Sequence, residues 1–249
     1  MTASGSTHTG LIRKENQDVF LIDNLFDGGL YICLVCDGMG GANSGNVASA
    51  LAANTFVDSF RAMLAPDLQN IEQCVVEAVS RANTQVYVHA RTTPDFSGMG
   101  TTLVAAVITK NSAIIANIGD SRAYLIESDQ ITQISNDHSL VQEMVNIGKI
   151  TPREAKNHPD KNLITRAVGT DENVQCDIYH VKCPVNSCIF LCSDGLYDLV
   201  DDDEILHHIK SAPNLQQGCD TLIDLAISRG GHDNITAVLF YNEEVNGVG

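Results

Sequence analysis

Aspartates stand at the ends of short apolar runs at several places in this 249-residue sequence. In LVCDG and IFLCSDG the aspartate closes the run and a glycine follows it, whereas in IIANIGDSR the glycine comes just before the aspartate. In RGGHDNIT an aspartate precedes the last apolar run, and in RKENQDVF another begins an early one. The residues concerned are Asp18, Asp37, Asp120, Asp194 and Asp233.

An aspartate beside a glycine is most often a turn former. Neighbouring strands that end in carboxylates would instead bring these groups together, and unpaired carboxylates that converge repel one another and raise their pKa values. Divalent cations remove that cost, and oxygen ligands suit Mg²⁺ or Mn²⁺ better than zinc. Glycines leave room for backbone carbonyls and water to reach a metal. The pattern therefore favours a metal site, with turn formation as the alternative at each position.

Phosphoryl transfer is chemistry that such a site supports. Two divalent ions about 3.5–4 Å apart can share a water, convert it to hydroxide and hold a phosphoryl oxygen. Arg13, shortly before Asp18, is a candidate to bind the phosphate because a guanidinium grips phosphate in a bidentate manner; the alternative is an ordinary surface charge. The sequence contains no G-x4-G-K-[ST] loop, no G-x-S-x-G elbow and no Cys-x5-Arg loop, which argues against those enzyme classes.

The composition narrows the class of protein. The net charge of −16 disfavours nucleic acid and anionic membranes as partners. No apolar run reaches the roughly 18 residues of a transmembrane helix, and residues 1–10 do not resemble a signal peptide. We therefore expect a cytoplasmic protein whose eight cysteines are reduced. Cys33 and Cys36 have C-x-x-C spacing, but a strand-like run with no second pair favours core packing over zinc binding.

The elements that must position the aspartates are clustered strands and paired helices. Apolar and β-branched runs predict strands over 18–23, 30–36, 101–109, 112–118, 122–127, 130–134, 174–182, 187–193 and 234–241. Helical spacing predicts helices over 45–64, 69–90, 201–210 and 214–228, and the polar segment 139–160 is loosely helical. No long linker or repeat interrupts the chain, so residues 1–249 are expected to form one α+β domain.

Eight segments, taken in order, resemble a known family. The sequence resembles a metal-dependent serine/threonine protein phosphatase of the PPM (type 2C) family in its compact bacterial form, from about residue 10 to residue 241. The segments are GLIRKENQD, VCDGMGGANSGNVAS, MGTTLVAA, NIGDSRAYLI, DHSLV, LITRAVG, LCSDGLYD and GGHDNIT. One alone is weakly specific, but eight in the same order are highly specific.

The resemblance implies a four-layer α-β-β-α sandwich of two antiparallel sheets flanked by helix pairs, with a metal site in a channel at one edge. It implies a binuclear Mn²⁺ or Mg²⁺ centre in which Asp37 bridges the ions and Gly38 offers its carbonyl. Asp194 and Asp233 would complete the pair, and Asp18 would act mainly through bound waters.

The resemblance also implies features around that pair. Asp120, with Asp194 and Asp198, resembles the third-metal site of bacterial members, so two to three ions per chain are expected. Arg13 matches the phosphate-binding arginine, and the segment from about 140 to 165 corresponds to a variable flap beside the channel. The implied mechanism is direct attack of metal-bound hydroxide on phosphorus, without a phospho-enzyme.

The sequence departs from the family pattern at three positions. Met39 stands where many eukaryotic members have a histidine proposed as general acid, so another group or a water must protonate the leaving group. Gln17 stands where glutamate is common and can still hold a metal-bound water, and Asn46 is expected to be a helix-surface change. Histidines that are candidates by composition alone to replace the missing acid are His138, His158 and His232.

The leading hypothesis is therefore a phosphatase acting on phosphoserine and phosphothreonine in proteins, opposing a eukaryotic-like Ser/Thr kinase. An alternative is a catalytically inactive module of the PPM fold that binds a partner, which predicts the loss of one or more metal ligands. A third is a phosphatase of the anti-anti-sigma type, dedicated to one small phosphoserine protein. A monomer is expected, because segment 139–160 has too few contiguous apolar residues for a dimer face.

Overall fold

The computed structural model describes residues 1–40, 44–64 and 68–243. The glycines that are expected to leave room for ligands include Gly41, which lies outside the described residues, as do its neighbours 42 and 43.

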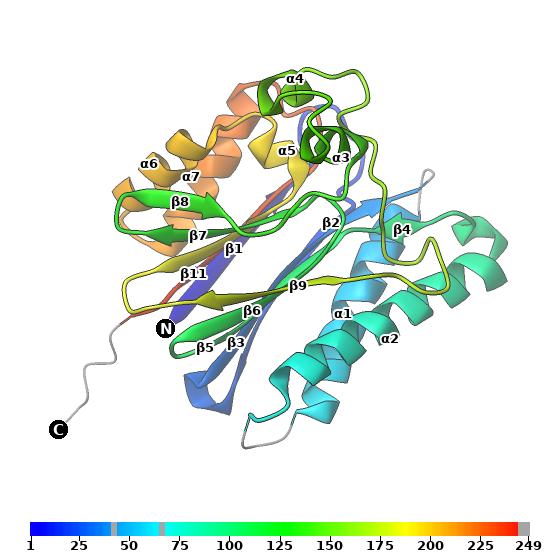
Figure 1. Ribbon diagram of the computed structural model, residues 1–249, viewed down its shortest axis with the longest axis horizontal. Helices are drawn as coiled ribbons and strands as arrows, with labels where there is room; N and C mark the ends of the chain where they lie inside the picture. The colour runs from blue at the N-terminus through cyan, green and yellow to red at the C-terminus, as the bar shows by residue number, and fades with distance from the viewer. Residues whose placement is uncertain (41–43, 65–67, 244–249) are drawn as a thin grey trace.

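Two sheets, antiparallel throughout, form the centre of the molecule (Figure 1). One sheet has the strand order β1-β11-β10-β7-β8, and the other has the order β2-β3-β5-β6-β9 with β4 paired to β3. The strands are β1 (Thr2–His8), β2 (Asp18–Leu25), β3 (Leu30–Met39), β4 (Gly100–Thr101), β5 (Leu103–Thr109), β6 (Ser112–Ile118), β7 (Arg122–Glu127), β8 (Gln130–Gln133), β9 (Asp177–Lys182), β10 (Cys188–Cys192) and β11 (Ile235–Tyr241).

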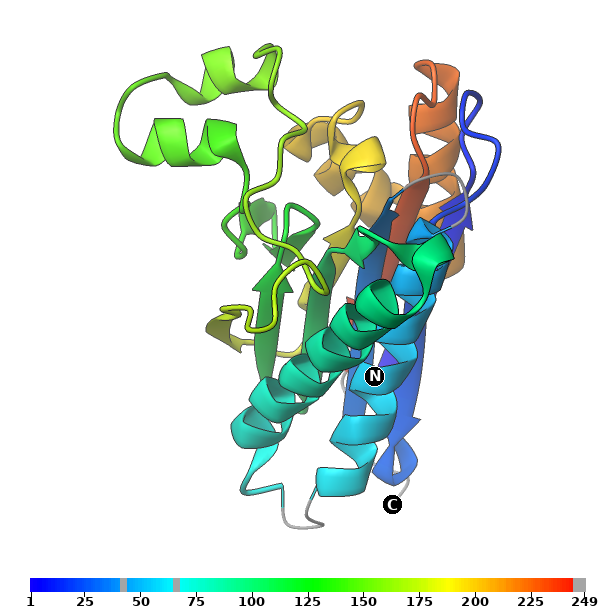
Figure 2. The same ribbon diagram turned by 90° about the vertical axis from the view of Figure 1, so that its right-hand side faces the viewer.

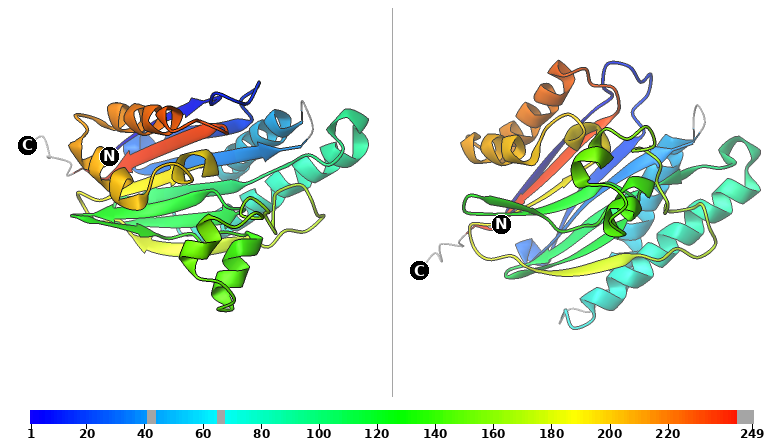
Figure 3. Two further views of the ribbon diagram at one scale, coloured as in Figure 1. Left: turned by 90° about the horizontal axis from the view of Figure 1, so that it is seen from above. Right: turned by 45° about the horizontal axis from the view of Figure 1, so that its top comes forward.

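Two pairs of helices cover the outer faces of the sheets. Helices α1 (Gly45–Met63) and α2 (Ile71–Thr92) cover the sheet that contains β3, and α6 (Asp202–Ser211) and α7 (Leu215–Ser228) cover the sheet that contains β11 (Figures 1 and 3). The shorter helices are α3 (Leu140–Asn146), α4 (Pro152–Lys156), α5 (Asp194–Tyr197) and the 3-10 turns η1 (Phe26–Gly28) and η2 (Pro94–Phe96).

Three buried apolar clusters join these four layers. Phe56 and Phe60 of α1 pack with Leu34 between the first helix pair and its sheet. Another cluster lies between the two sheets. The last lies between the sheet that contains β11 and the helices α6 and α7. This arrangement confirms the predicted four-layer α-β-β-α sandwich, because each sheet buries one face against the other sheet and one against helices.

The cysteine pair illustrates the alternation along a buried strand. Cys33 belongs to the cluster between the sheets, whereas Cys36 belongs to the cluster under α1 and α2. Residues three apart on a strand point to opposite faces, so the two thiols cannot chelate one ion. The prediction of core packing is confirmed, and all eight cysteines are free thiols.

Residues 2–8 lack the apolar alternation that predicts a strand, yet they form β1. Every residue of β1 pairs with β11, from Thr2 opposite Tyr241 to His8 opposite Ile235. A side chain on Gly5 would come within 2.7 Å of the Phe20 ring, so small residues let this edge strand lie close to the other sheet. The polar composition of residues 2–8 does not indicate a strand. The strand forms because it pairs with β11, which is more than 200 residues away in the sequence.

The remaining boundaries differ from the predicted ones by a few residues. The run over 101–109 is divided into β4 and β5, and the run over 187–193 ends as β10 at Cys192. Asp194 is therefore the first residue of α5 rather than the last residue of a strand. Among the described residues, no helix is both long and apolar enough to cross a membrane.

The flap, residues 140–165, carries two short helices, as the loosely helical pattern predicts. Ser139 caps α3 by accepting a hydrogen bond from Gln142 N. Thr151 and Glu154 form a reciprocal capping box at the start of α4. The flap and the loop of residues 9–17 lie on opposite sides of one end of the molecule (Figure 2).

Candidate metal centre

Two of the predicted ligands face each other across a pair of strands. Asp18 begins β2 and lies directly opposite Asp37 in the antiparallel register with β3. Side chains at such positions have Cβ atoms about 4.5–5.5 Å apart, so the two carboxylates repel each other when both are charged.

Two neighbouring threonines fix the backbone of Asp37 by hydrogen bonds to its N–H and its carbonyl. Asp37 N donates to the hydroxyl of Thr102 (2.8 Å), and Asp37 O accepts from the Thr101 hydroxyl (2.9 Å). Gly38 is confined by backbone: a Cβ there would lie 2.1 Å from the Gly45 carbonyl and 2.6 Å from that of Gln17. Only glycine fits at this position, which explains the Asp-Gly pair.

Asp194 and Asp120 each lie just outside a strand. Asp194 opens α5 after Ser193, and Asp120 lies between β6 and β7. Asp120 is buried, and the Tyr197 hydroxyl donates to its carbonyl (3.0 Å). Together with Asp37 and Asp233, these residues line a cleft of about 210 Å³.

Burial and mutual repulsion raise the pKa values of four carboxyl groups, as the sequence argument predicts. Desolvation is the largest cause in each case. It raises the pKa of Asp18 to about 6 and that of Asp120 to about 7. The pKa values of Asp37 and Asp194 lie well above the ordinary range, and the charges of neighbouring aspartates contribute to both.

The hydrogen bonds of Asp18 leave one oxygen available. The hydroxyls of Ser193 and Thr236 each donate to Asp18 Oδ2 (2.7 Å). Asp18 Oδ1 and Asp194 Oδ1 are both buried and have no hydrogen-bond partner. Orphaned carboxylate oxygens in a cluster of raised pKa fit hard divalent cations, so the donor set suits Mg²⁺ or Mn²⁺.

Arg13 lies at the mouth of the cleft and binds one of the candidate ligands. Its Nη2 donates to Asp233 Oδ2 (2.7 Å), and the charges of Asp37 and Asp194 add to this contact in raising the pKa of the guanidinium. The side chain is 54% exposed, so it can turn toward a ligand in the cleft.

Among residues 1–40, 44–64 and 68–243, no group of three His, Cys, Asp or Glu side chains is arranged to hold a metal ion as it stands. Asp233 is bound by Arg13, and one oxygen of Asp18 is bound by two hydroxyls. Arg13 therefore holds one oxygen of Asp233, a carboxylate whose remaining lone pairs could bind an ion.

Asp198 lies beside the flap. Its Oδ2 pairs with Lys161 Nζ (2.5 Å), and Asp201 pairs with Lys156 (2.6 Å), so two flap lysines contact the segment after α5. A cavity of about 320 Å³ lies under the flap and shares Asp120 and Asp194 with the cleft.

The positions that depart from the family pattern lie in or near the cleft. Met39 and Gln17 both line it, and the Met39 methyl would touch a side chain placed on Gly100. Asn46 is half-buried and its Oδ1 is enclosed without a partner, so its prediction as a helix-surface residue is wrong. The reason is that the first turn of α1 packs against the end of β3, where Gly45 approaches Gly38.

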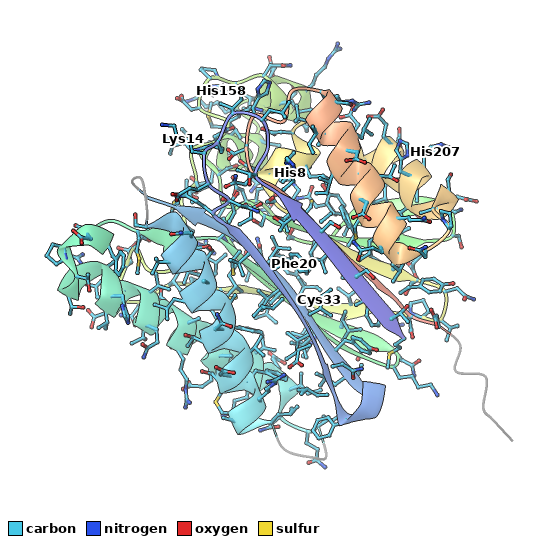
Figure 4. All side chains as sticks on the ribbon, turned by 180° about the vertical axis from the view of Figure 1, so that it is seen from behind. His8, Lys14, Phe20, Cys33, His158 and His207 are labelled. Carbon is cyan, nitrogen blue, oxygen red and sulfur yellow. The ribbon has the colours of Figure 1, made fainter. Side chains whose placement is uncertain are left out.

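The three candidate histidines occupy different places. His138 is buried behind Gly119, with Nδ1 accepting from the glycine N–H (3.0 Å). His158 belongs to the flap, at the same end of the molecule as Lys14 (Figure 4), and its Nδ1 lies 3.9 Å from Asp160 Oδ2. His232 is exposed and lines a pocket with Asp194 and Asp233.

Several residues around the centre have partners that the sequence does not reveal. Arg122 does not touch the Asp120 side chain; it pairs with Asp137 (2.7 Å) and stacks on the Tyr197 ring (3.6 Å). The Thr236 hydroxyl donates to Asp18, which is far away in the sequence.

Asn234 fixes the loop of residues 9–17, which carries Arg13. Its side chain donates to the carbonyls of Thr9 and Glu15 and accepts from Gln17 N, so it holds the loop that presents Arg13. Its place in GGHDNIT is the only signal that marks it in the sequence.

Comparison with known proteins agrees with this geometry. The family model for protein phosphatase 2C matches residues 12–223. The serine/threonine phosphatase Stp of Listeria welshimeri is 37% identical over 247 residues, which cover 96% of this chain and 95% of the relative. The structure of Stp1 from Staphylococcus aureus has a TM-score of 0.91 at 36% identity, covering 97% of this chain and 95% of that one.

A further structure bears on the metal. The catalytic domain of PstP, solved in complex with two manganese ions, has a TM-score of 0.83 at 32% identity and covers 96% of each chain. The matches extend over nearly the whole chain, and the chain therefore belongs to the protein phosphatase 2C family.

Proposed function

We propose that this protein serine/threonine phosphatase hydrolyses phosphoserine and phosphothreonine in proteins at a centre of two to three Mn²⁺ or Mg²⁺ ions. The observation that carries the proposal is the convergence of four buried or half-buried aspartates, Asp37, Asp120, Asp194 and Asp233, on one cleft that Arg13 also lines. Bound divalent ions would supply the acidity that activates water and the charge that stabilises the phosphoryl group.

The ligands are proposed in two groups. Asp37, Gly38, Asp194 and Asp233 line the same cleft and would hold the central pair of ions. Asp18 would support this pair through water, because Ser193 and Thr236 already fix one of its oxygens. Asp120, Asp194 and Asp198 line the cavity under the flap and would form the third position.

Arg13 would bind the phosphoryl group of the substrate. Its exposed guanidinium faces the charges of Asp37, Asp194 and Asp233, so it lies where a phosphate held by metal ions would also lie. Guanidinium and phosphate match in geometry and charge, which supports this role over an ordinary surface charge.

Leaving-group protonation is the one role with no assigned side chain. Met39 lines the cleft and carries no proton, and His138 is buried with Nδ1 occupied. A water in the cleft is the simplest proton source.

The remaining biological context is supported by the family resemblance and by the composition of the chain. We propose a monomeric cytoplasmic enzyme that opposes a eukaryotic-like Ser/Thr kinase and acts on its substrates. A dedicated phosphatase of the anti-anti-sigma type would instead prefer one small phosphoserine protein, and a panel of phosphoproteins separates the two.

The inactive-module hypothesis predicts that a ligand is missing. Every carboxylate that the family pattern requires is present in the sequence, and Asp37, Asp194 and Asp233 line one cleft, which supports the enzyme over the inactive module.

Hydrolysis of a phosphothreonine peptide by metal-stripped protein, titrated with Mn²⁺ and with Mg²⁺, tests the proposal. Asp194→Asn should abolish turnover, whereas Asp224→Asn, on the exposed face of α7, should leave it unchanged. Full turnover by Asp194→Asn would refute the assigned roles. No turnover by folded wild-type protein with either ion would favour the inactive module.

A further inference from the structure

The two ends of the flap meet beside the turn that carries Asp120. Thr165 N donates to the carbonyl of His138 (2.8 Å), and Ser139 and Ile164 form an isolated antiparallel bridge. The chain therefore enters and leaves the flap as a short two-stranded neck, and His138 is the first residue of that neck.

His138 is bonded twice to the glycine that precedes Asp120. Gly119 N–H donates to Nδ1 of the ring (3.0 Å), and His138 N–H donates to the Gly119 carbonyl (2.9 Å). Gly119 has φ +103°, and a Cβ there would lie 2.6 Å from the Thr102 methyl, so the turn needs glycine. The next carbonyl, that of Asp120, accepts from the Tyr197 hydroxyl.

The other ring nitrogen is also engaged. Because Nδ1 accepts, the neutral ring carries its proton on Nε2, which donates to Asp177 Oδ2 (3.1 Å). Arg166, at the end of the neck, pairs with the same Asp177 (2.9 Å), and its Nη1 also lies 3.1 Å from His138 Nε2. The ring is 4% exposed, so no substrate can reach it. Burial lowers the pKa of His138 and keeps the ring neutral at neutral pH.

We propose that His138 is a positioning residue that fixes the flap neck and the Asp120 carboxylate relative to each other, and that it acts through its bond to Gly119. The proposal rests on the proposed function only for its catalytic consequence. Flap placement and the third metal position are set together, because one side chain holds the neck on one side and the Gly119–Asp120 turn on the other.

Three substitutions of His138 distinguish the hydrogen bond of Nδ1 from that of Nε2. His138→Asn keeps an oxygen near the position of Nδ1 and can accept from Gly119 N–H, but it cannot reach Asp177. His138→Gln can reach Asp177 with its amide but leaves the glycine N–H without an acceptor. His138→Ala loses both bonds.

Hydrogen exchange in metal-free protein tests the link without any need for turnover. Loss of a buried acceptor should speed exchange of the Gly119 amide and of the flap by about tenfold or more in the Ala and Gln variants. The Asn variant should stay within about threefold of wild type. Equal protection in all four proteins, or rescue by Gln rather than Asn, overturns the proposal.

Binding and turnover test the catalytic consequence. The Ala and Gln variants should lose Mn²⁺ affinity at the weakest site and lose kcat, by about tenfold each, whereas Asn should restore both. The loss should be equal for a phosphothreonine peptide and for p-nitrophenyl phosphate, whose leaving group needs no proton. A loss confined to phosphothreonine would make the ring a proton donor and overturn the proposal. If exchange behaves as expected but wild type shows no turnover, the proposed function fails and the positioning role stands.

Discussion

Removal of the Arg13 guanidinium should impair catalysis far more than stability. The contact with Asp233 joins side chains that are 54% and 28% exposed, and exposed ion pairs contribute about 0–1 kcal/mol. For a chain of this size, Arg13→Ala should therefore lower the melting temperature by no more than about 4 °C. Loss of charge-assisted hydrogen bonds to a phosphoryl group costs about 1.5–3 kcal/mol, which is about 10- to 150-fold in kcat/KM.

The assay is steady-state hydrolysis of a phosphothreonine peptide at saturating Mn²⁺, beside thermal unfolding of the metal-free protein. Arg13→Lys should give an intermediate loss, since an ammonium keeps the charge but not the paired donors. Lys14→Ala is the matched control: this neighbouring cation is exposed, does not line the cleft and should change kcat/KM by less than about twofold. Unchanged kcat/KM in Arg13→Ala, or an equal loss in Lys14→Ala, would refute phosphate binding by Arg13.

Three further outcomes follow from the contacts around the centre. Thr236→Val removes one of two hydroxyls from the buried Asp18 carboxyl and should cost about 1–3 kcal/mol in urea unfolding; an unchanged midpoint would contradict this. Lys161→Met frees Asp198 from a competing cation and should raise Mn²⁺ affinity at the weakest site by up to about fivefold in calorimetry; weaker binding would show that the lysine helps the site instead. The pKa of His138 is lowered in the folded state, so its contribution to stability is present above the ordinary pKa near 6.5 and is lost as the pH falls through the folded value. In His138→Asn the melting temperature should therefore fall less steeply as the pH is lowered. Melting temperatures that fall in parallel in the variant and in wild type would contradict this.

The ligands of the centre could be predicted because their signal is local. Asp37 shows it best: the apolar run of β3 and the Asp-Gly step reflect a strand end whose next residue, Gly38, is pressed against backbone. The same logic holds for the opposite strand, where register places Asp18 against Asp37. Each of these features involves neighbouring residues or a hairpin, so a single sequence contains it.

The parts that could not be predicted depend on contacts between distant segments. Thr236 binds Asp18 across 218 positions, and β1 is a strand only because β11 lies beside it. Arg122 stacks on Tyr197 and pairs with Asp137, and nothing in the sequence around Arg122 indicates either contact. Composition and spacing do not indicate which distant residues will pair. Many hydroxyl and carboxylate side chains in the sequence could serve equally well as partners.

The measurement that tests the central claim most directly is the number of Mn²⁺ ions bound by metal-stripped protein, counted in parallel with turnover of a phosphothreonine peptide. Wild type should bind at least two ions and turn over only when they are bound. Asp37→Asn should lose tight binding and turnover together, while its metal-free form should be at least as stable as wild type, because one repelling carboxylate has gone. Turnover by wild type without divalent ions, or full Mn²⁺ binding by Asp37→Asn, would contradict a carboxylate-held metal centre in this cleft.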